Sequence, residues 1–172
     1  MAELQRRVGL ELLRRFPVAR RSGALLDVGC GTGFLTRQLA LIENYHPLIA
    51  LDLALPMLQI SRCKYPGMAV NYLCADAENL PFAPQSIAQI YSNLALQWAQ
   101  YLPATLAGFR RVLRPGGALV FATFGPATLC ELKTAWAAVD RYTHVNDFHA
   151  ADDLKGFLQV AGLKVASVDT VL

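Results

Sequence analysis

The sequence predicts an α/β fold built around an open parallel sheet. Short apolar segments typical of buried strands alternate with segments whose apolar residues recur at helical spacing. The first strand runs directly into a turn with alternating glycines, and each of the first three strands ends in or near an aspartate. Because parallel strands end at one edge of such a sheet, we expect Asp27, Asp52 and Asp76 to converge on one ligand-binding crevice.

Length and composition favour a single domain over residues 1–172. The hydrophobic share of 54% indicates that helices cover both sheet faces or that a normally covered surface is exposed. No apolar run reaches the roughly 18 residues of a membrane span and the start lacks a secretory signal, so we expect a cytoplasmic protein. A net charge of +3 is too small to indicate nucleic-acid binding.

The cysteines show neither a C-x-x-C pair nor metal-ligand spacing with a histidine. We therefore expect reduced thiols, mostly in or near the core, and no metal site. The four are Cys30, Cys63, Cys74 and Cys130.

Apolar spacing predicts an amphipathic helix over Leu4–Phe16, followed by a buried strand over Ala24–Val28. The glycine turn comes next, and its residues tolerate positive φ and leave backbone N–H groups available to a ligand. Asp27 would repel a phosphate there and would favour a positively charged ligand such as S-adenosylmethionine. The alternative is an ordinary turn in which Asp27 acts only as a local turn former. The three glycines are Gly29, Gly31 and Gly33.

The middle of the chain continues the alternation of strand and helix. Asp52 lies about twenty residues past the glycine turn, where an acid can reach ribose hydroxyls, although it could also be a helix cap. The expected elements are a helix over Phe34–Ile42, a strand over Pro47–Leu51, a helix over Leu55–Lys64, and strands over Ala69–Cys74 and Ile87–Tyr91.

Asn93 follows the fourth strand, where a catalytic loop is expected, with Gln97 and Trp98 as a polar group and a ring beside it. The alternative is a helix start with a buried tryptophan. The remaining elements are expected to be a helix over Ala104–Leu113, a stop at Arg114–Gly117, a strand over Ala118–Phe124, helices over Leu129–Val139 and Ala151–Ala161 around a polar loop, and a last strand over Leu163–Val171.

Three motifs together resemble class I S-adenosylmethionine-dependent methyltransferases: LLDVGCGTG over Leu25–Gly33, ADAENLPF over Ala75–Phe82 and RVLRPGG over Arg111–Gly117. The resemblance implies a Rossmann-like, doubly wound sheet of seven strands with the last antiparallel. Relative to that family, the chain is expected to lack the final antiparallel strand and the N-terminal lid.

A narrower resemblance points to the malonyl-[acyl-carrier protein] O-methyltransferases of biotin synthesis. It rests on four segments: Ser92–Trp98, Thr128–Lys133, Ala135–Asp140 and His144–Asn146. This resemblance implies transfer of a methyl group from S-adenosylmethionine to the free carboxylate of a malonyl thioester, carried by acyl-carrier protein or coenzyme A. Neither a membrane nor a nucleic acid is expected as a partner.

The resemblance also implies roles for individual residues. Asp27 with Gly29, Cys30, Gly31 and Gly33 would hold the methionine part of the cofactor, Asp52 the ribose, Asp76 with the Ala77 backbone the adenine edge, Leu53 and Met57 the adenine face, and Asn93 would close the site near the sulfonium. From their place in the polar loop, Arg141 and secondly His144 are expected to position the substrate carboxylate. That carboxylate is already ionised at neutral pH, so no general base is required.

Other functions are compatible with the same sequence motifs. The chain could be a methyltransferase acting on a quinone precursor or another small molecule, a methyltransferase-like assembly factor for a respiratory complex, or a fragment that does not bind the cofactor. Arg110, Arg111 and Arg114 could meet an acidic carrier protein or form a solvated helix face.

Overall fold

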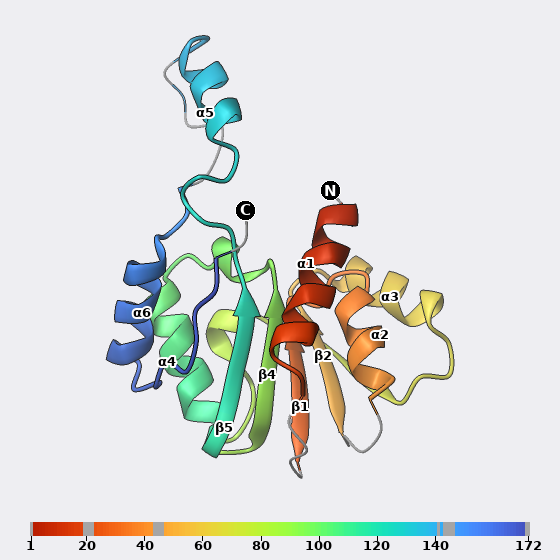
Figure 1. The fold of residues 1–172 in the computed structure, drawn as a ribbon. Coiled ribbons are helices and arrows are strands. Elements are labelled where there is room, and N and C mark those ends of the chain that lie inside the picture. Colours follow the sequence, from red (N-terminus) through yellow and green to blue (C-terminus); the bar gives the residue numbers. More distant parts are fainter. Residues whose placement is uncertain (1, 19–22, 43–46, 141, 143–146, 171–172) are drawn as a thin grey trace.

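A computed structural model of the chain describes residues 2–18, 23–42, 47–140, 142 and 147–170. Its centre is a sheet of five parallel strands in the order β3-β2-β1-β4-β5, so the α/β prediction is confirmed (Figure 1). The strands are β1 (Ala24–Val28), β2 (Leu48–Asp52), β3 (Val70–Cys74), β4 (Ile87–Asn93) and β5 (Leu113–Ala122).

Helices cover both faces of this sheet (Figure 1). The first face carries α1 (Ala2–Arg15), α2 (Phe34–Ala40) and α3 (Leu55–Lys64); the second carries α4 (Leu102–Val112) and α6 (Ala151–Val160). The helix α5 (Cys130–Ala137) stands away from the sheet (Figure 1). Two short 3-10 helices, η1 (Ala77–Asn79) and η2 (Leu96–Trp98), lie in the loops after β3 and β4.

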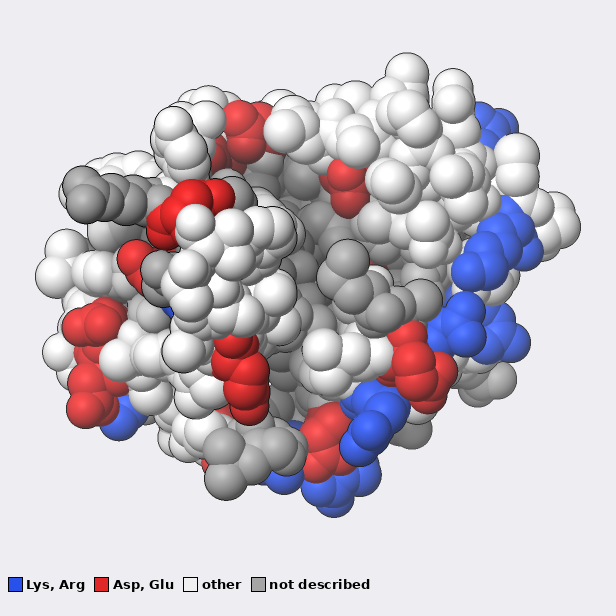
Figure 2. All heavy atoms as spheres, turned by 90° about the horizontal axis from the view of Figure 1, so that it is seen from above, with Lys and Arg blue, Asp and Glu red and all other residues white. Residues whose placement is uncertain are grey.

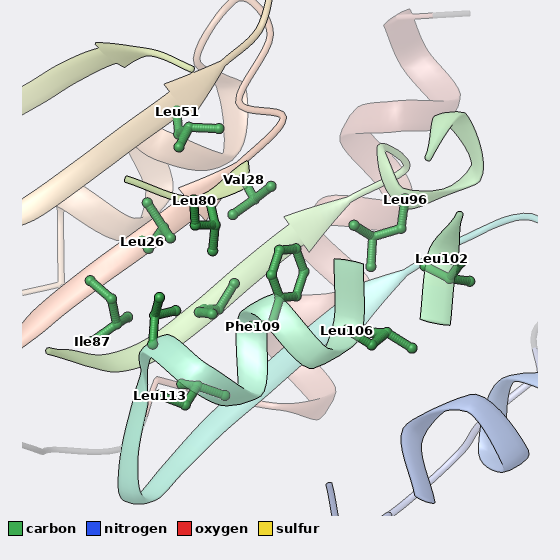
Figure 3. Close-up of a cluster of buried hydrophobic side chains, with 12 residues drawn as sticks. Leu26, Val28, Leu51, Leu80, Ile87, Leu96, Leu102, Leu106, Phe109 and Leu113 are labelled. Atoms are coloured by element: carbon green, nitrogen blue, oxygen red, sulfur yellow. The ribbon is translucent and has the colours of Figure 1, made fainter. Parts of the chain in front are cut away.

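The core divides between the two faces because side chains alternate along each strand. Leu26 of β1 packs on the α4 face with Leu106 and Phe109, all fully buried (Figure 3). Its neighbour Leu25 packs on the opposite face in the cluster that contains Leu12 of α1. The central strand is therefore buried on both sides, which explains its nearly continuous apolar sequence.

Most predicted elements lie within about two residues of the observed ones, and Leu55–Lys64 and Ala24–Val28 coincide with α3 and β1. The helix stop predicted at Arg114–Gly117 is confirmed, since α4 ends at Val112, but the start predicted for the next strand at Ala118 is wrong, because β5 begins at Leu113, directly after α4. The pairing of β5 with β4 shifts in register across this stretch, so it forms a bulge inside the strand.

The last predicted strand, Leu163–Val171, is also wrong: within the described part, residues 163–170 form no strand. Leu163 packs instead against the core cluster beneath α4. From Ala166 onward the side chains are exposed, and Asp169 forms an ion pair with Arg15 of α1 at 3.0 Å. Local apolar content is insufficient for a strand that has no neighbouring strand to supply hydrogen bonds.

The expectation of mostly core cysteines is wrong for three of the four. Cys30 is buried, whereas Cys63, Cys74 and Cys130 are exposed; all four thiols are free. Among the described residues, no helix is both long and apolar enough to cross a membrane.

Candidate functional site

The glycine turn after β1 lies at the edge of the sheet where the parallel strands end. Gly29, Gly31 and Gly33 all have positive φ, at 68°, 53° and 82°. A Cβ on Gly29 would lie 2.2 Å from the Ala95 Cβ, and one on Gly33 would lie 2.0 Å from the Ser61 Oγ, whereas one on Gly31 would meet nothing within 4 Å. The outer glycines thus permit tight packing, and Gly31 faces open space.

Asp52, the last residue of β2, fixes this turn. Its carboxylate accepts hydrogen bonds from the backbone N–H groups of Gly31 and Ala54, each at 2.8 Å. The side chain remains partly exposed, so lone pairs of the carboxylate are still available to the hydroxyl groups of a ligand. That these lone pairs bind a ribose stays a prediction.

Asp27 is almost completely buried, with 1% of its surface exposed, on the α2 side of β1. The Thr36 hydroxyl donates a hydrogen bond to it at 2.6 Å. Burial raises the pKa of Asp27 to about 7, and the nearby Asp52 carboxylate acts in the same direction. Asp27 therefore lies inside the fold with its charge weakened near neutral pH, and its contact with the methionine part of a cofactor stays a prediction.

Cys30 lies within the same turn. Burial raises the pKa of its thiol, with Asp27 and Asp52 adding to the effect, so the thiol stays protonated. The expectation that the N–H groups of this turn are free for a ligand is wrong for three of its residues. The N–H groups of Gly29 and Cys30 donate to the Leu51 carbonyl at 2.8 and 3.0 Å, and the Gly33 N–H donates to the Cys30 carbonyl at 3.0 Å.

Asp76 and Ala77, the residues predicted to bind the adenine edge, form a short capped turn. The Asp76 carboxylate accepts a hydrogen bond from the N–H of Glu78 at 2.9 Å, and Ala77 begins η1. The Glu78 carboxylate in turn accepts from the Gln100 N–H at 2.8 Å, which ties this turn to the loop after β4. The structure thus holds the Asp76 turn in place at this edge.

Leu53 and Met57, the residues predicted for the adenine face, are exposed apolar side chains. Their exposed fractions are 70% and 39%, and they follow directly on Asp52 at the start of α3. A planar apolar group would cover surface here that water now covers.

Asn93 ends β4 and lies against α1. Its Nδ2 donates a hydrogen bond to the Gln5 carbonyl at 2.9 Å, and a Cβ on the buried Gly9 would lie 3.1 Å from that nitrogen. The Asn93 Oδ1 is buried and has no hydrogen-bond partner among the described residues. Sequence reasoning missed this contact with α1; a glycine inside an amphipathic helix was the only signal for it.

Arg141 and His144, the residues predicted to position a substrate carboxylate, lie outside the described residues. Trp98 has 71% of its surface exposed, which contradicts the buried-tryptophan alternative. Within the described ranges, no group of three or more His, Cys, Asp or Glu side chains could hold a metal ion.

A cavity of about 300 Å³ lies beyond the ends of β4 and β5. Its polar lining includes Gln97 of η2, Thr123 just after β5, and His149. Sequence reasoning assigned no role to Thr123 or His149, because position after a strand is the only signal that Thr123 gives. Figure 2 looks onto this edge of the molecule and shows Lys and Arg side chains gathered on the side of α1, α2 and α3.

Comparison with known proteins gives a family match over most of the sheet. Residues 26–121 match the family described as "Methyltransferase domain". The chain is 45% identical over 164 residues to the biotin biosynthesis bifunctional protein BioHC of Cellvibrio japonicus, with 95% of this chain and 32% of that protein covered. It is 41% identical over 175 residues to the malonyl-[acyl-carrier protein] O-methyltransferase of Methylococcus capsulatus, covering 98% and 62% of the two chains.

Among solved structures, a chain from the complex of the Haloferax volcanii Trm112 methyltransferase activator with a methyltransferase superposes with a TM-score of 0.84 at 23% identity. The match covers 99% of this chain and 73% of that one. This similarity confirms the fold. The chain spans less than two thirds of the two sequence relatives that it matches.

Proposed function

Since the chain belongs to the methyltransferase domain family, we propose that it binds S-adenosylmethionine and methylates the free carboxylate of malonyl-acyl-carrier protein in biotin synthesis. The observation that best supports cofactor binding is the Asp52 carboxylate held by the Gly31 N–H beside open space. The names of the relatives support the substrate.

The residues at the sheet edge fit this cofactor chemically. Asp52 would hold the ribose hydroxyls, Asp76 and the Ala77 backbone the adenine edge, Leu53 and Met57 the adenine face, and the turn from Gly29 to Gly33 the methionine part. When bound, the cofactor supplies the methyl group: a carboxylate oxygen bonds to the methyl carbon, the carbon–sulfur bond breaks and its electron pair stays on sulfur, which leaves S-adenosylhomocysteine and a methyl ester.

The protein's own contribution is alignment and exclusion of water. The turn and Asp52 fix one reactant, and α1 covers Asn93 at the end of β4. Opposite charges neutralise one another in this reaction, so a site closed to water favours it. The malonyl carboxylate is ionised at neutral pH, and proton abstraction is not needed.

We propose that an acidic carrier protein approaches on the side of α1. Residues 1–64 hold nine of the sixteen Lys and Arg residues but only five of the thirteen acids. Arg6 and Arg7 are exposed in the first half of α1, which begins above the ends of the strands (Figure 1). Charge complementarity of this kind speeds encounter and orients the partner.

Two of the three arginines first considered for this contact lie against other parts of the chain. The Arg111 guanidinium donates to the carbonyls of Phe82 at 2.7 Å and Leu80 at 2.8 Å. The Arg114 guanidinium lies against Gly23, which precedes β1 at the opposite edge of the sheet. A location in the cytoplasm stays a prediction from the sequence.

The test is methyl transfer from labelled S-adenosylmethionine to malonyl-acyl-carrier protein, with malonyl-coenzyme A in parallel. We expect a malonyl methyl ester from both, and Arg7→Glu should raise KM severalfold for the carrier-linked substrate alone, with Lys164→Glu as the matched exposed control. Methylation of a hydroxylated aromatic compound but of neither thioester would contradict the proposal and favour the quinone-type alternative.

A further inference from the structure

The cavity beyond β4 and β5 adjoins the glycine turn through one short segment. Ala95 lies against Gly29 of the turn, and the next two residues, Leu96 and Gln97, line the cavity. On the other wall, Thr123 follows Ala122, the residue paired with Asn93 between β4 and β5. A ligand in this cavity would therefore lie next to anything bound at the turn.

The inner end of the cavity has a hydroxyl group with a weak partner. The Gln97 Nε2 donates to the Leu94 carbonyl at 2.7 Å, which fixes the amide. The Thr123 Oγ1 contacts the Gln97 Oε1 at 3.5 Å, the long limit of a hydrogen bond. The Thr123 hydroxyl could donate a shorter and stronger bond to a carboxylate oxygen.

The outer end carries a negative charge that is already neutralised. Asp147 forms an ion pair with Lys133 at 2.9 Å, and this lysine lowers the pKa of Asp147. The same ammonium group stands over the Phe148 ring, 5.4 Å from its centroid. Among the described residues that line this rim, the one acid is paired, so the rim does not repel a carboxylate that passes it on the way to Thr123.

Between the two ends the walls include apolar side chains, and the cavity is small. Leu96, Leu102 and Phe121 contribute to them, and about 300 Å³ is at the small end of ligand pockets. A methylene group between a carboxylate and a thioester fits such a space.

We propose that this cavity is the acceptor subsite for the carboxylate end of a short dicarboxylic acyl thioester, with Thr123 donating a hydrogen bond to the reacting carboxylate. The inference rests on the proposed function, because it assigns to that function the residues that hold its substrate. It adds Thr123 to Arg141 and His144, the residues predicted from the sequence, as a direct contact of the carboxylate.

The test is Thr123→Val, which keeps the shape of the side chain and removes the hydroxyl. Loss of a hydrogen bond to a charged group should raise KM for malonyl-acyl-carrier protein about tenfold or more, while the Kd for S-adenosylhomocysteine stays within about twofold. Thr123→Ser should restore KM. Thr134→Val is the matched control, because its hydroxyl is exposed and, among the described residues, donates only to the Cys130 carbonyl within α5.

An unchanged KM, or an equal loss of S-adenosylhomocysteine affinity, would overturn the assignment. If the unaltered chain methylates no malonyl thioester, the proposed function fails, and the cavity is then tested by NMR titration with malonyl-pantetheine at saturating S-adenosylhomocysteine. Binding that Thr123→Val weakens would sustain the acceptor subsite; no binding, or equal binding by both proteins, would refute it.

Discussion

The buried carboxyl of Asp27 is the side chain whose chemistry the fold changes most clearly. In an unfolded chain its pKa is near 3.8, whereas burial in the folded protein raises it to about 7. Between these values the folded protein holds a proton that the unfolded chain has lost. The free energy of unfolding therefore falls as pH rises through this range, and the full contribution is present below about pH 4.

We expect Asp27→Asn to remove part of this pH dependence. The amide keeps the shape and does not ionise, so the variant should lose less stability than the unaltered protein between pH 5 and pH 8. Urea denaturation at both pH values measures the difference. Asp152→Asn alters an exposed carboxylate on α6 and should leave the pH dependence of the free energy of unfolding unchanged in this range. If the free energy of unfolding of Asp27→Asn falls between pH 5 and pH 8 as much as that of the unaltered protein, the account is refuted.

Sequence reasoning located Asp52 correctly and could not foresee the surroundings of Asp27. A carboxylate at a strand end near a glycine turn is visible in the sequence, and the structure places Asp52 there with two backbone donors. Whether such a carboxylate faces a ligand or a helix depends on side-chain alternation and on Thr36, nine residues away. Thr123 was missed because its partners come from distant elements.

At the scale of elements, the glycines of the turn have two different roles. Gly29 and Gly33 allow close packing, whereas Gly31 leaves space that a ligand can enter. Gly31→Ala should leave the fold intact at a cost of about 1 kcal/mol for positive φ, yet weaken S-adenosylhomocysteine binding, because its Cβ would enter the open space. Gly29→Ala should cost more stability, because its Cβ would overlap Ala95.

Thermal unfolding and calorimetric titration of both variants test this distinction. The matched comparison is the pair itself, since each adds one methyl group at positive φ. Equal losses of stability with unchanged binding by Gly31→Ala would contradict the assigned roles.

Elements with strong local signals could be predicted, and those that depend on a distant partner could not. The segment Leu55–Lys64 has Pro56 in its first turn and basic residues in its last, and both features are typical of a helix by themselves. The segment after Gly162 is apolar enough for a strand, but the structure gives it the α4 cluster and an ion pair with α1 instead of a neighbouring strand.

At the scale of the molecule, the parallel sheet brings together groups that are far apart in sequence. The Gly31 N–H and the Asp52 carboxylate meet from two strands, and Glu78 ties the turn after β3 to the loop after β4. All of these contacts lie along one edge, with the cavity beside them. The family resemblance indicated this edge, but the cavity required the structure, because its walls come from η2, β5, α4, α6 and residues 147–149.

The most direct test of cofactor binding at this edge is calorimetric titration of the chain and of Asp52→Asn with S-adenosylhomocysteine. We expect binding of one equivalent by the unaltered chain and a loss of about tenfold or more in affinity for the variant, because the ribose hydroxyls lose a charged acceptor. Glu131→Gln, a change to an exposed carboxylate on α5, should bind as the unaltered chain does. No binding by the unaltered chain, or equal binding by Asp52→Asn, would contradict the site.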